Sequence, residues 1–210
     1  LCGMTTENIT IPAMASGPDR IFFFGAGSGT GSPGLSGIRG VTTVASPVVT
    51  IAQSAPKVSW QNVWIGGADT GTTALVSHGI GTSMEWNNCT FYTDALSAIG
   101  YNLGSCVGVD IRGCRITGPT NLGVIATGST SPDDVLIEGC FFEQSAGVAL
   151  TNTQSSDDIS IVNNRFADGR INVVRFSHLL IVGNKLQGHA TLPEIEIGGA
   201  NSQDATITGN

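Results

Sequence analysis

The sequence has few charged residues and very little lysine. Only 12% of its 210 residues are charged, about half the usual share of a soluble protein. Lysine occurs only at Lys57 and Lys185, and glutamate contributes six residues. Lysine, glutamate and arginine build the exposed faces of helices. The composition therefore argues against a helical bundle, a coiled coil and a doubly wound α/β fold.

Three further absences restrict the partners. No run of about 18 apolar residues occurs, so the sequence predicts no membrane-spanning helix and no membrane partner. The formal charge is −7 and the lysines and arginines are scattered, which disfavours nucleic acid because phosphate contacts need a basic face. The five cysteines form no CxxC motif and no Cys/His cluster with zinc spacing, so no metal or other cofactor is expected.

One short pattern recurs from residue 58 onward. Apolar residues at alternate positions are followed by Gly or Asn, one fixed position, any residue and a further apolar residue. Clear examples are VDIRGCRI at 109–116 and VLIEGCFF at 135–142. The fixed positions, which we call ladder positions, lie about 25 residues apart except for one interval of 20. They are Val63, Cys89, Cys114, Cys140, Asn164, Asn184 and Asn210.

Each repeat predicts three short strands and one sharp turn. Apolar and polar residues alternate on both sides of the ladder position, which is typical of β-strands. The residue before the ladder position is always Gly or Asn, the residue types that best tolerate the left-handed conformation. A third strand is expected between repeats, as at 98–103, 123–128 and 147–152. The pattern predicts an all-β fold, a single-stranded right-handed parallel β-helix with about 25 residues per coil.

Equivalent residues of successive coils should stack at the spacing of about 4.8 Å between paired strands. The ladder asparagines should then form hydrogen bonds from coil to coil. The ladder cysteines should form an apolar stack rather than disulfides. Twelve inward residues are expected to be buried, namely Val58, Trp60, Met84, Trp86, Val109, Ile111, Val135, Ile137, Ile159, Ile161, Leu179 and Ile181.

The whole chain is expected to form one β-helix domain over residues 1–210. Residues 58–210 contain the regular coils, and residues 1–57 contain irregular early coils that we assign to the same solenoid. No linker marks a second domain. The sequence starts at Leu1 without an initiator Met and ends at Asn210 inside a repeat, so we expect a fragment of a longer protein.

Candidate catalytic residues lie on the outward face of the strand between repeats. Glu194 and Glu196 are two residues apart on one strand face, which separates them by about 6.6 Å. That value is at the low edge of the carboxyl separation in inverting glycoside hydrolases. Arg175, aligned with Glu196 on the adjacent coil, is expected to bind an acidic sugar or to tune one carboxylate. The competing interpretation is a cross-strand salt bridge on a solvated face.

The same alignment places further residues beside these carboxylates. Asn102, Thr127 and Thr151 are expected to share one outward column and to bind substrate. The column that contains Arg175 and Glu196 also contains Leu75, Gly100, Ile125 and Ala149.

An acidic stripe lies near one turn of the repeat. Asp134, Asp158 and Asp204 lie six residues before their ladder positions, and His178 has this place in its own repeat. Stacked carboxylates raise one another's pKa and can form a cation site or an acid/base pair. The surrounding composition is that of ordinary turns, so a solvated turn is the favoured interpretation.

The repeated I-x-[GN]-[NC]-x-F units, with ITIPA at 9–13 and IFFFGAGSGT at 21–30, resemble the pectate-lyase-like superfamily of β-helices. The likeness is greatest to the β-helical bodies of phage tailspikes. The calcium-binding aspartates and catalytic arginine of the pectate lyases have no match here. The resemblance implies a polysaccharide partner, an extracellular or virion-surface location, and a homotrimer assembled along the helix axis.

We therefore expect a carbohydrate-recognising β-helix of a phage tailspike or an extracellular polysaccharide depolymerase of the glycoside hydrolase type. A polysaccharide lyase or epimerase stays open, in which Arg175 would neutralise a uronate and a glutamate would abstract its proton. A non-catalytic fibre or adhesin segment stays open as well. A row of outward apolar residues, expected at Leu75, Ile125, Phe141 and Val173, would form the contact between subunits.

Overall fold

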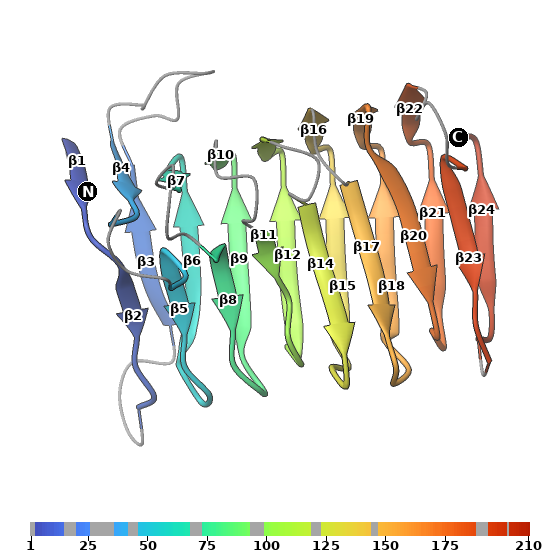
Figure 1. Ribbon diagram of the computed structural model, residues 1–210, viewed down its shortest axis with the longest axis horizontal. Coiled ribbons are helices and arrows are strands. Elements are labelled where there is room, and N and C mark those ends of the chain that lie inside the picture. Colours follow the sequence, from blue (N-terminus) through green and yellow to red (C-terminus); the bar gives the residue numbers. More distant parts are fainter. Residues whose placement is uncertain are drawn as a thin grey trace.

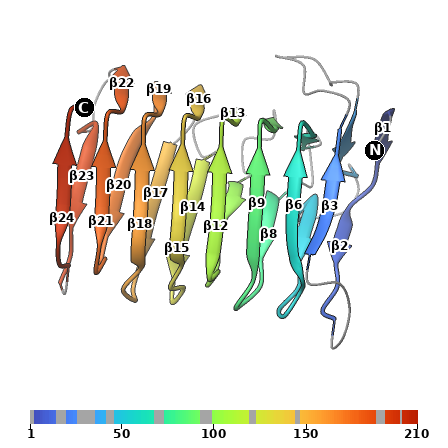
Figure 2. The same cartoon turned by 180° about the vertical axis from the view of Figure 1, so that it is seen from behind.

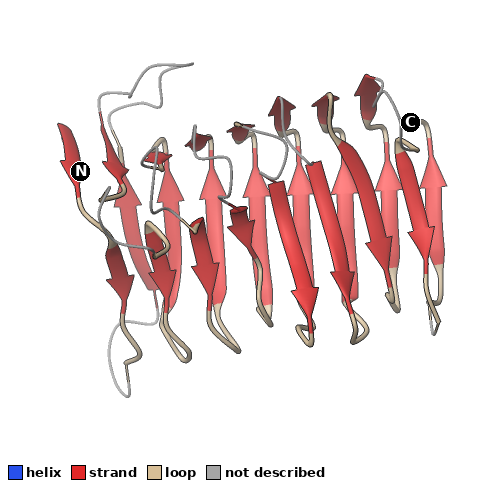
Figure 3. Ribbon diagram, viewed as in Figure 1, coloured by secondary structure: helices blue, strands red, loops and turns tan. Residues whose placement is uncertain are grey.

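The computed structural model describes residues 3–14, 20–25, 36–41, 46–67, 73–92, 99–118, 123–143, 147–187, 193–200 and 202–210. These residues form a right-handed parallel β-helix with about 25 residues per turn, in which every described element is a strand (Figures 1 and 3). The predicted fold class is confirmed. Within the described residues, no helix is long and apolar enough to cross a membrane.

Each coil contributes one strand to each of three parallel sheets. Sheet A contains β1 (Gly3–Thr6), β4 (Ser36–Arg39), β7 (Trp64–Gly66), β10 (Thr90–Tyr92), β13 (Arg115–Thr117), β16 (Phe141–Glu143), β19 (Arg165–Ala167) and β22 (Lys185–Gln187). Sheet B contains β2 (Ile9–Ile11), β5 (Val49–Ile51), β8 (Ala74–His78), β11 (Ile99–Asn102), β14 (Gly123–Gly128), β17 (Gly147–Asn152), β20 (Arg170–Val174) and β23 (Ile195–Gly198). Sheet C contains β3 (Arg20–Phe24), β6 (Lys57–Gln61), β9 (Ser83–Asn87), β12 (Gly108–Arg112), β15 (Asp133–Glu138), β18 (Asp157–Val162), β21 (Leu179–Val182) and β24 (Ala205–Thr208).

The early coils pair into the same sheets as the regular ones. Strands β1, β2 and β3 pair in parallel with β4, β5 and β6, which continue into the regular coils. These early strands therefore lie in the same three sheets as the later ones. Parts of the early segments, at 26–35 and 42–45, lie outside the described residues.

A left-handed residue turns the chain from sheet C to sheet A in each regular coil. All seven expected positions have φ between 52° and 65°, namely Asn62, Asn88, Gly113, Gly139, Asn163, Gly183 and Gly209. At Gly183 a Cβ atom would also lie 2.4 Å from Oδ1 of Asn163, one coil earlier. Glycine at this kink therefore supplies the conformation and leaves room for the preceding asparagine.

The asparagine ladder forms as expected. The backbone N–H of Cys140 donates to Oδ1 of Asn164 at 2.8 Å, that of Asn164 to Asn184 at 3.0 Å, and that of Asn184 to Asn210 at 2.9 Å. The Nδ2 groups of Asn164 and Asn184 each donate to a carbonyl oxygen and to the next asparagine, so these two amides are satisfied despite their burial. These hydrogen bonds between coils therefore fix the register of the coils that contain Asn164, Asn184 and Asn210.

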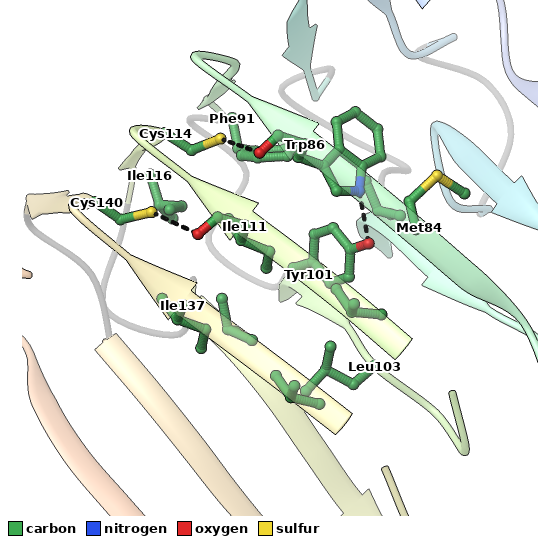
Figure 4. Close-up of a cluster of buried hydrophobic side chains, with 14 of the residues drawn as sticks. Met84, Trp86, Phe91, Tyr101, Leu103, Ile111, Cys114, Ile116, Ile137 and Cys140 are labelled. Carbon is green, nitrogen blue, oxygen red and sulfur yellow. Dashed lines mark hydrogen bonds between the residues drawn. The ribbon is translucent and has the colours of Figure 1, made fainter. Parts of the chain in front are cut away.

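The cysteine stack adjoins this ladder. The backbone N–H of Cys89 donates to Sγ of Cys114 at 3.4 Å, and the thiol of Cys140 donates to the carbonyl oxygen of Ile111 at 3.3 Å (Figure 4 shows the second bond). Cys89, Cys114 and Cys140 are buried free thiols, as predicted.

Apolar side chains stack along the axis inside the three sheets. All twelve residues expected to be buried are at most 3% exposed. The rings of Trp60 and Trp86 stack with centroids 4.9 Å apart, and those of Phe142 and Phe166 with centroids 4.6 Å apart. Burial of a large apolar side chain contributes about 1.5–3 kcal/mol, so these stacks supply much of the stability of each coil.

One chain of hydrogen bonds crosses the core of the middle coils. Nε1–H of Trp86 donates to the hydroxyl of Tyr101 at 2.6 Å, and that hydroxyl donates to Nε2 of His78 at 2.6 Å (Figure 4 shows the first bond). Nδ1–H of His78 donates to Thr82 at 2.8 Å, and Thr82 donates to the carbonyl oxygen of Gly79 at 3.0 Å. The last bond uses the only hydroxyl hydrogen of Thr82 and so assigns the histidine tautomer. Burial lowers the pKa of His78 to about 3, which keeps the ring neutral.

Candidate functional site

The strand register does not place Arg175 opposite Glu194 or Glu196. Strands β20 and β23 pair Asn172, not Arg175, with Glu196. Arg175 lies just beyond β20 in a left-handed conformation with φ of 59°, and its guanidinium donates to the carbonyl oxygen of Thr153. The predicted alignment of Arg175 with Glu196 is therefore wrong. It fails here because the coil between Asn164 and Asn184 is shorter than the others, which moves the register by three residues.

A different arginine reaches Glu196. Nη1 of Arg170 donates to Oε2 of Glu196 at 3.0 Å, and the two side chains are 24% and 50% exposed. Glu194 is also exposed and lies directly before β23. This geometry is a cross-strand salt bridge on a solvated face, as in the competing interpretation, and the partner of Glu196 is Arg170.

The predicted substrate-binding residues fall into two columns of sheet B rather than one. Thr127 pairs with Thr151, and both are exposed. Asn102 pairs with Ile125, two residues earlier along that strand, and its Oδ1 accepts from the backbone N–H of Gly104 at 3.2 Å. The single column of Asn102, Thr127 and Thr151 is therefore wrong.

The register also corrects the predicted column and the apolar row. Gly100 does not align with Ile125, because Ile125 pairs with Asn102. Leu75 and Val173 are fully buried, so they cannot form an exposed contact between subunits. Val173 pairs with Leu150 of the preceding coil, which is also fully buried. Ile125 and Phe141 are half-buried.

The outer face of sheet C has two rows of aromatic and polar side chains that run across adjacent strands. Strands β3, β6, β9 and β12 lie side by side, as Figure 2 shows from behind. Parallel pairing places equivalent outward residues next to one another in two rows. The first row is Phe22, Ser59, Glu85 and Asp110, and the second is Phe24, Gln61, Asn87 and Arg112.

Glu85 is the electrostatic centre of these rows. Its carboxylate accepts hydrogen bonds from Arg20, from Nζ of Lys57 at 2.8 Å and from the hydroxyl of Ser59 at 2.8 Å. Partial burial acts to raise its pKa, but the hydrogen bonds from Lys57 and Ser59 and the charges of Lys57 and Arg20 outweigh this and lower the pKa. Glu85 is therefore ionised at neutral pH.

A polar hollow adjoins Glu85. Glu85, Asn87, Asp110 and Arg112 line a volume of about 240 Å³. Arg112 donates to Oδ2 of Asp110 at 3.2 Å, and its Nη1 atom lies 3.9 Å from Oε2 of Glu138. The hollow thus offers two carboxylates, one guanidinium and one amide, which can bind hydroxyl groups as donors and acceptors.

An exposed aromatic pair lies on the same face. Phe22 and Phe24 are 54% and 57% exposed, and their rings stack with centroids 6.0 Å apart and planes within 11°. The guanidinium of Arg20 lies 5.3 Å from the centre of the Phe22 ring. Two exposed and nearly parallel rings offer apolar surface, which suits the C–H face of a sugar ring.

The sequence contained a signal for this face. The polar residues of the hollow occupy the two variable positions of the repeat, between the buried apolar ones, in MEWN at 84–87 and VDIR at 109–112. Alternation shows that such residues point outward. Only the register shows which of them stand next to one another across coils.

No protein-family model, no curated protein and no solved structure matches the chain. The fold defines the class, which is a parallel β-solenoid. The outer face of β3, β6, β9 and β12 contains both the exposed aromatic pair and the polar hollow.

Proposed function

We propose that this chain is the polysaccharide-binding β-helix of a tailspike-like protein with the pectate-lyase-like architecture. The outer face of β3, β6, β9 and β12 binds the polysaccharide. The observation that supports this most is the exposed, stacked pair of Phe22 and Phe24 in the same rows as the polar hollow. Apolar stacking beside clustered donors and acceptors is what a sugar, with one apolar face and a hydroxyl rim, requires.

The solenoid also suits a long ligand. Coils repeat about every 4.8 Å, so polar side chains recur along the axis and can contact successive sugar residues. The stacked strands are rigid, so binding costs little ordering of the protein.

Hydrolysis is a second candidate, favoured by the two carboxylates of the hollow. Glu85 and Asp110 pair across adjacent strands, whose backbones lie about 4.8 Å apart. Carboxyl groups of retaining glycoside hydrolases lie about 5–5.5 Å apart. The lowered pKa of Glu85 suits a nucleophile, and Asp110 is the second carboxyl group of the pair.

The proposal extends to location and assembly. A tailspike-like β-helix acts outside the cell or on a virion surface, as a homotrimer. Half-buried Ile125 and Phe141 stay available for a contact between subunits, and sedimentation or light scattering of the longest soluble form of the chain measures the subunit number.

The test is binding of the chain to a panel of bacterial polysaccharides, measured by calorimetry. Replacing both aromatic residues, as Phe22→Ala with Phe24→Ala, should weaken binding at least about tenfold, because ring contacts contribute about 0.5–1.5 kcal/mol each beyond the buried area. Ile80→Ala is the matched control, because Ile80 is 62% exposed in the turn after β8. Equal binding by the aromatic variant and the control, with circular dichroism unchanged, would refute the proposed face.

Glu85→Gln and Asp110→Asn test the hydrolytic candidate separately. For any polysaccharide that binds, release of reducing ends should fall at least about a hundredfold in each variant if both residues are catalytic. Binding without release of reducing ends by the unmodified chain would leave carbohydrate binding as its function and exclude hydrolysis of that polysaccharide.

A further inference from the structure

Two aspartates and a histidine from adjacent coils meet at the turns that lead into sheet C. Asp157 and Asp158 begin β18, and His178 lies directly before β21. Nδ1 of His178 lies 2.9 Å from Oδ1 of Asp157 and 3.2 Å from Oδ1 of Asp158. One ligand atom from each residue lies within 4.8 Å of the other two.

The negative charge of this cluster exceeds what the histidine can balance. Nδ1 has at most one hydrogen, yet two carboxylates lie within hydrogen-bond distance of it. Among the ion pairs of the described residues, none brings a lysine or arginine to Asp157 or Asp158. Even with a protonated imidazole the three groups keep a net charge of −1, and Asp204 of the next coil lines the hollow beside them.

We propose that His178, Asp157 and Asp158 form a binding site for a divalent transition-metal cation such as Zn²⁺ or Ni²⁺. An imidazole nitrogen with carboxylate oxygens is a ligand set that such ions accept, whereas Mg²⁺ and Ca²⁺ prefer oxygen alone. Bonds of about 2.0–2.1 Å in a tetrahedron separate the ligand atoms by about 3.3 Å. The observed separations of 2.9 and 3.2 Å are near this value, so a metal can replace the shared proton after a small outward shift.

The adjoining hollow leaves space for a further ligand. It has a volume of about 350 Å³ and is lined by Asp158 and His178 together with Ser160, Asp204 and Thr206. A water molecule or the carboxylate of Asp204 can complete the coordination from this side. The bound ion would tie the coil of β18 to the coil of β21.

The preceding coil provides a natural comparison. Asp133 pairs with Asp157, and Asp134 has the same left-handed backbone as Asp158, with φ of 49° and 45°. Among the described residues, no histidine joins Asp133 and Asp134 to form a group of three ligand atoms. The imidazole therefore distinguishes the proposed site from an ordinary acidic turn.

The experiment is calorimetric titration of the chain with ZnCl₂, NiCl₂ and CaCl₂ at neutral pH. We expect one Zn²⁺ or Ni²⁺ site whose affinity falls about a hundredfold or more in His178→Gln and in Asp157→Asn, since loss of even a supporting group costs 10–100-fold. The matched control Asp133→Asn should bind as the unmodified chain does. The side chain of His178 is 59% exposed, so His178→Gln should fold normally, and circular dichroism checks this.

A second measurement separates this site from thiol ligation. The absorption spectrum of bound Co²⁺ should show nitrogen and oxygen ligation without thiolate, and it should vanish in His178→Gln. Equal Zn²⁺ binding by the unmodified chain and His178→Gln would overturn the proposal. So would binding of Ca²⁺ at least as tightly as Zn²⁺, because that result would indicate an acidic turn alone. Neither result depends on whether the chain binds polysaccharide.

Discussion

Acidification from pH 7 to pH 5 should destabilise the middle coils through one buried histidine. His78 is neutral in the fold, where burial lowers its pKa to about 3, and it donates to Thr82 while accepting from Tyr101. In the unfolded chain its pKa is about 6.5. Between these two values the unfolded chain binds a proton that the folded chain excludes. The stability that the neutral histidine contributes is therefore fully present above pH 6.5 and declines as the pH falls toward 3.

The size of the effect follows from the difference in pKa. Each pH unit below 6.5 lowers the free energy of unfolding by about 1.4 kcal/mol until the folded pKa is reached. At pH 5 the loss is about 2 kcal/mol. Glu85 also has a lowered pKa, but its contribution changes mainly below its ordinary value of 4.5, so it adds little between pH 7 and pH 5. The raised pKa of exposed His178 acts in the opposite direction.

The assay is urea unfolding followed by tryptophan fluorescence, since Trp60 and Trp86 are fully buried. Unfolding midpoints are compared at pH 7, 6 and 5 for the unmodified chain and for His78→Gln, which has no titrating group at this position. The difference in the free energy of unfolding between the two chains should decrease by about 2 kcal/mol from pH 7 to pH 5. If both chains lose the same stability between pH 7 and pH 5, the proposed role of the histidine is refuted.

Three predictions about the core and the ladder are tested by urea unfolding at pH 7. Tyr101→Phe removes a hydroxyl that serves two buried groups, so it should cost about 2–4 kcal/mol, and a cost below 1 kcal/mol would contradict the hydrogen-bond chain. Asn184→Ala should cost about 1–3 kcal/mol, and more than Asn210→Ala, because Asn184 is buried and bonded to ladder residues on both sides, whereas Asn210 is exposed. Gly183→Ala should cost more than Gly209→Ala. Both have positive φ, but a Cβ at the former meets an oxygen at 2.4 Å and at the latter nothing nearer than 3.9 Å. Equal costs would show that the asparagine side chain moves aside.

The fold was predictable because each coil obeys local rules that recur. The alternation of apolar residues, as at Val109 and Ile111, predicts a strand, and the Gly or Asn that follows predicts the turn. Neither prediction needs information from another coil. The need to bury the apolar side chains of every coil then leaves one way to stack the coils. The ladder of Asn164 and Asn184 follows directly from the period.

The outward faces were less predictable because no core restricts them. Glu196 was assigned the wrong arginine because the short coil changes the number of residues between its ladder position and sheet B. The polar rows around Glu85 were not identified at all. Their chemistry depends on contacts between coils about 25 residues apart at positions where any residue type fits the strand.

Two buried thiols of the middle coils, Cys106 and Cys114, can report local opening of the solenoid. Burial raises the pKa of Cys106 to about 12 and raises that of Cys114 as well, so neither thiol reacts while its coil is closed. Each becomes reactive only when its own turn of the solenoid opens. Because coils contact only their neighbours, opening can spread from one turn without unfolding the rest. The rate of thiol labelling, followed residue by residue by mass spectrometry, would therefore map how far such a local opening spreads along the axis.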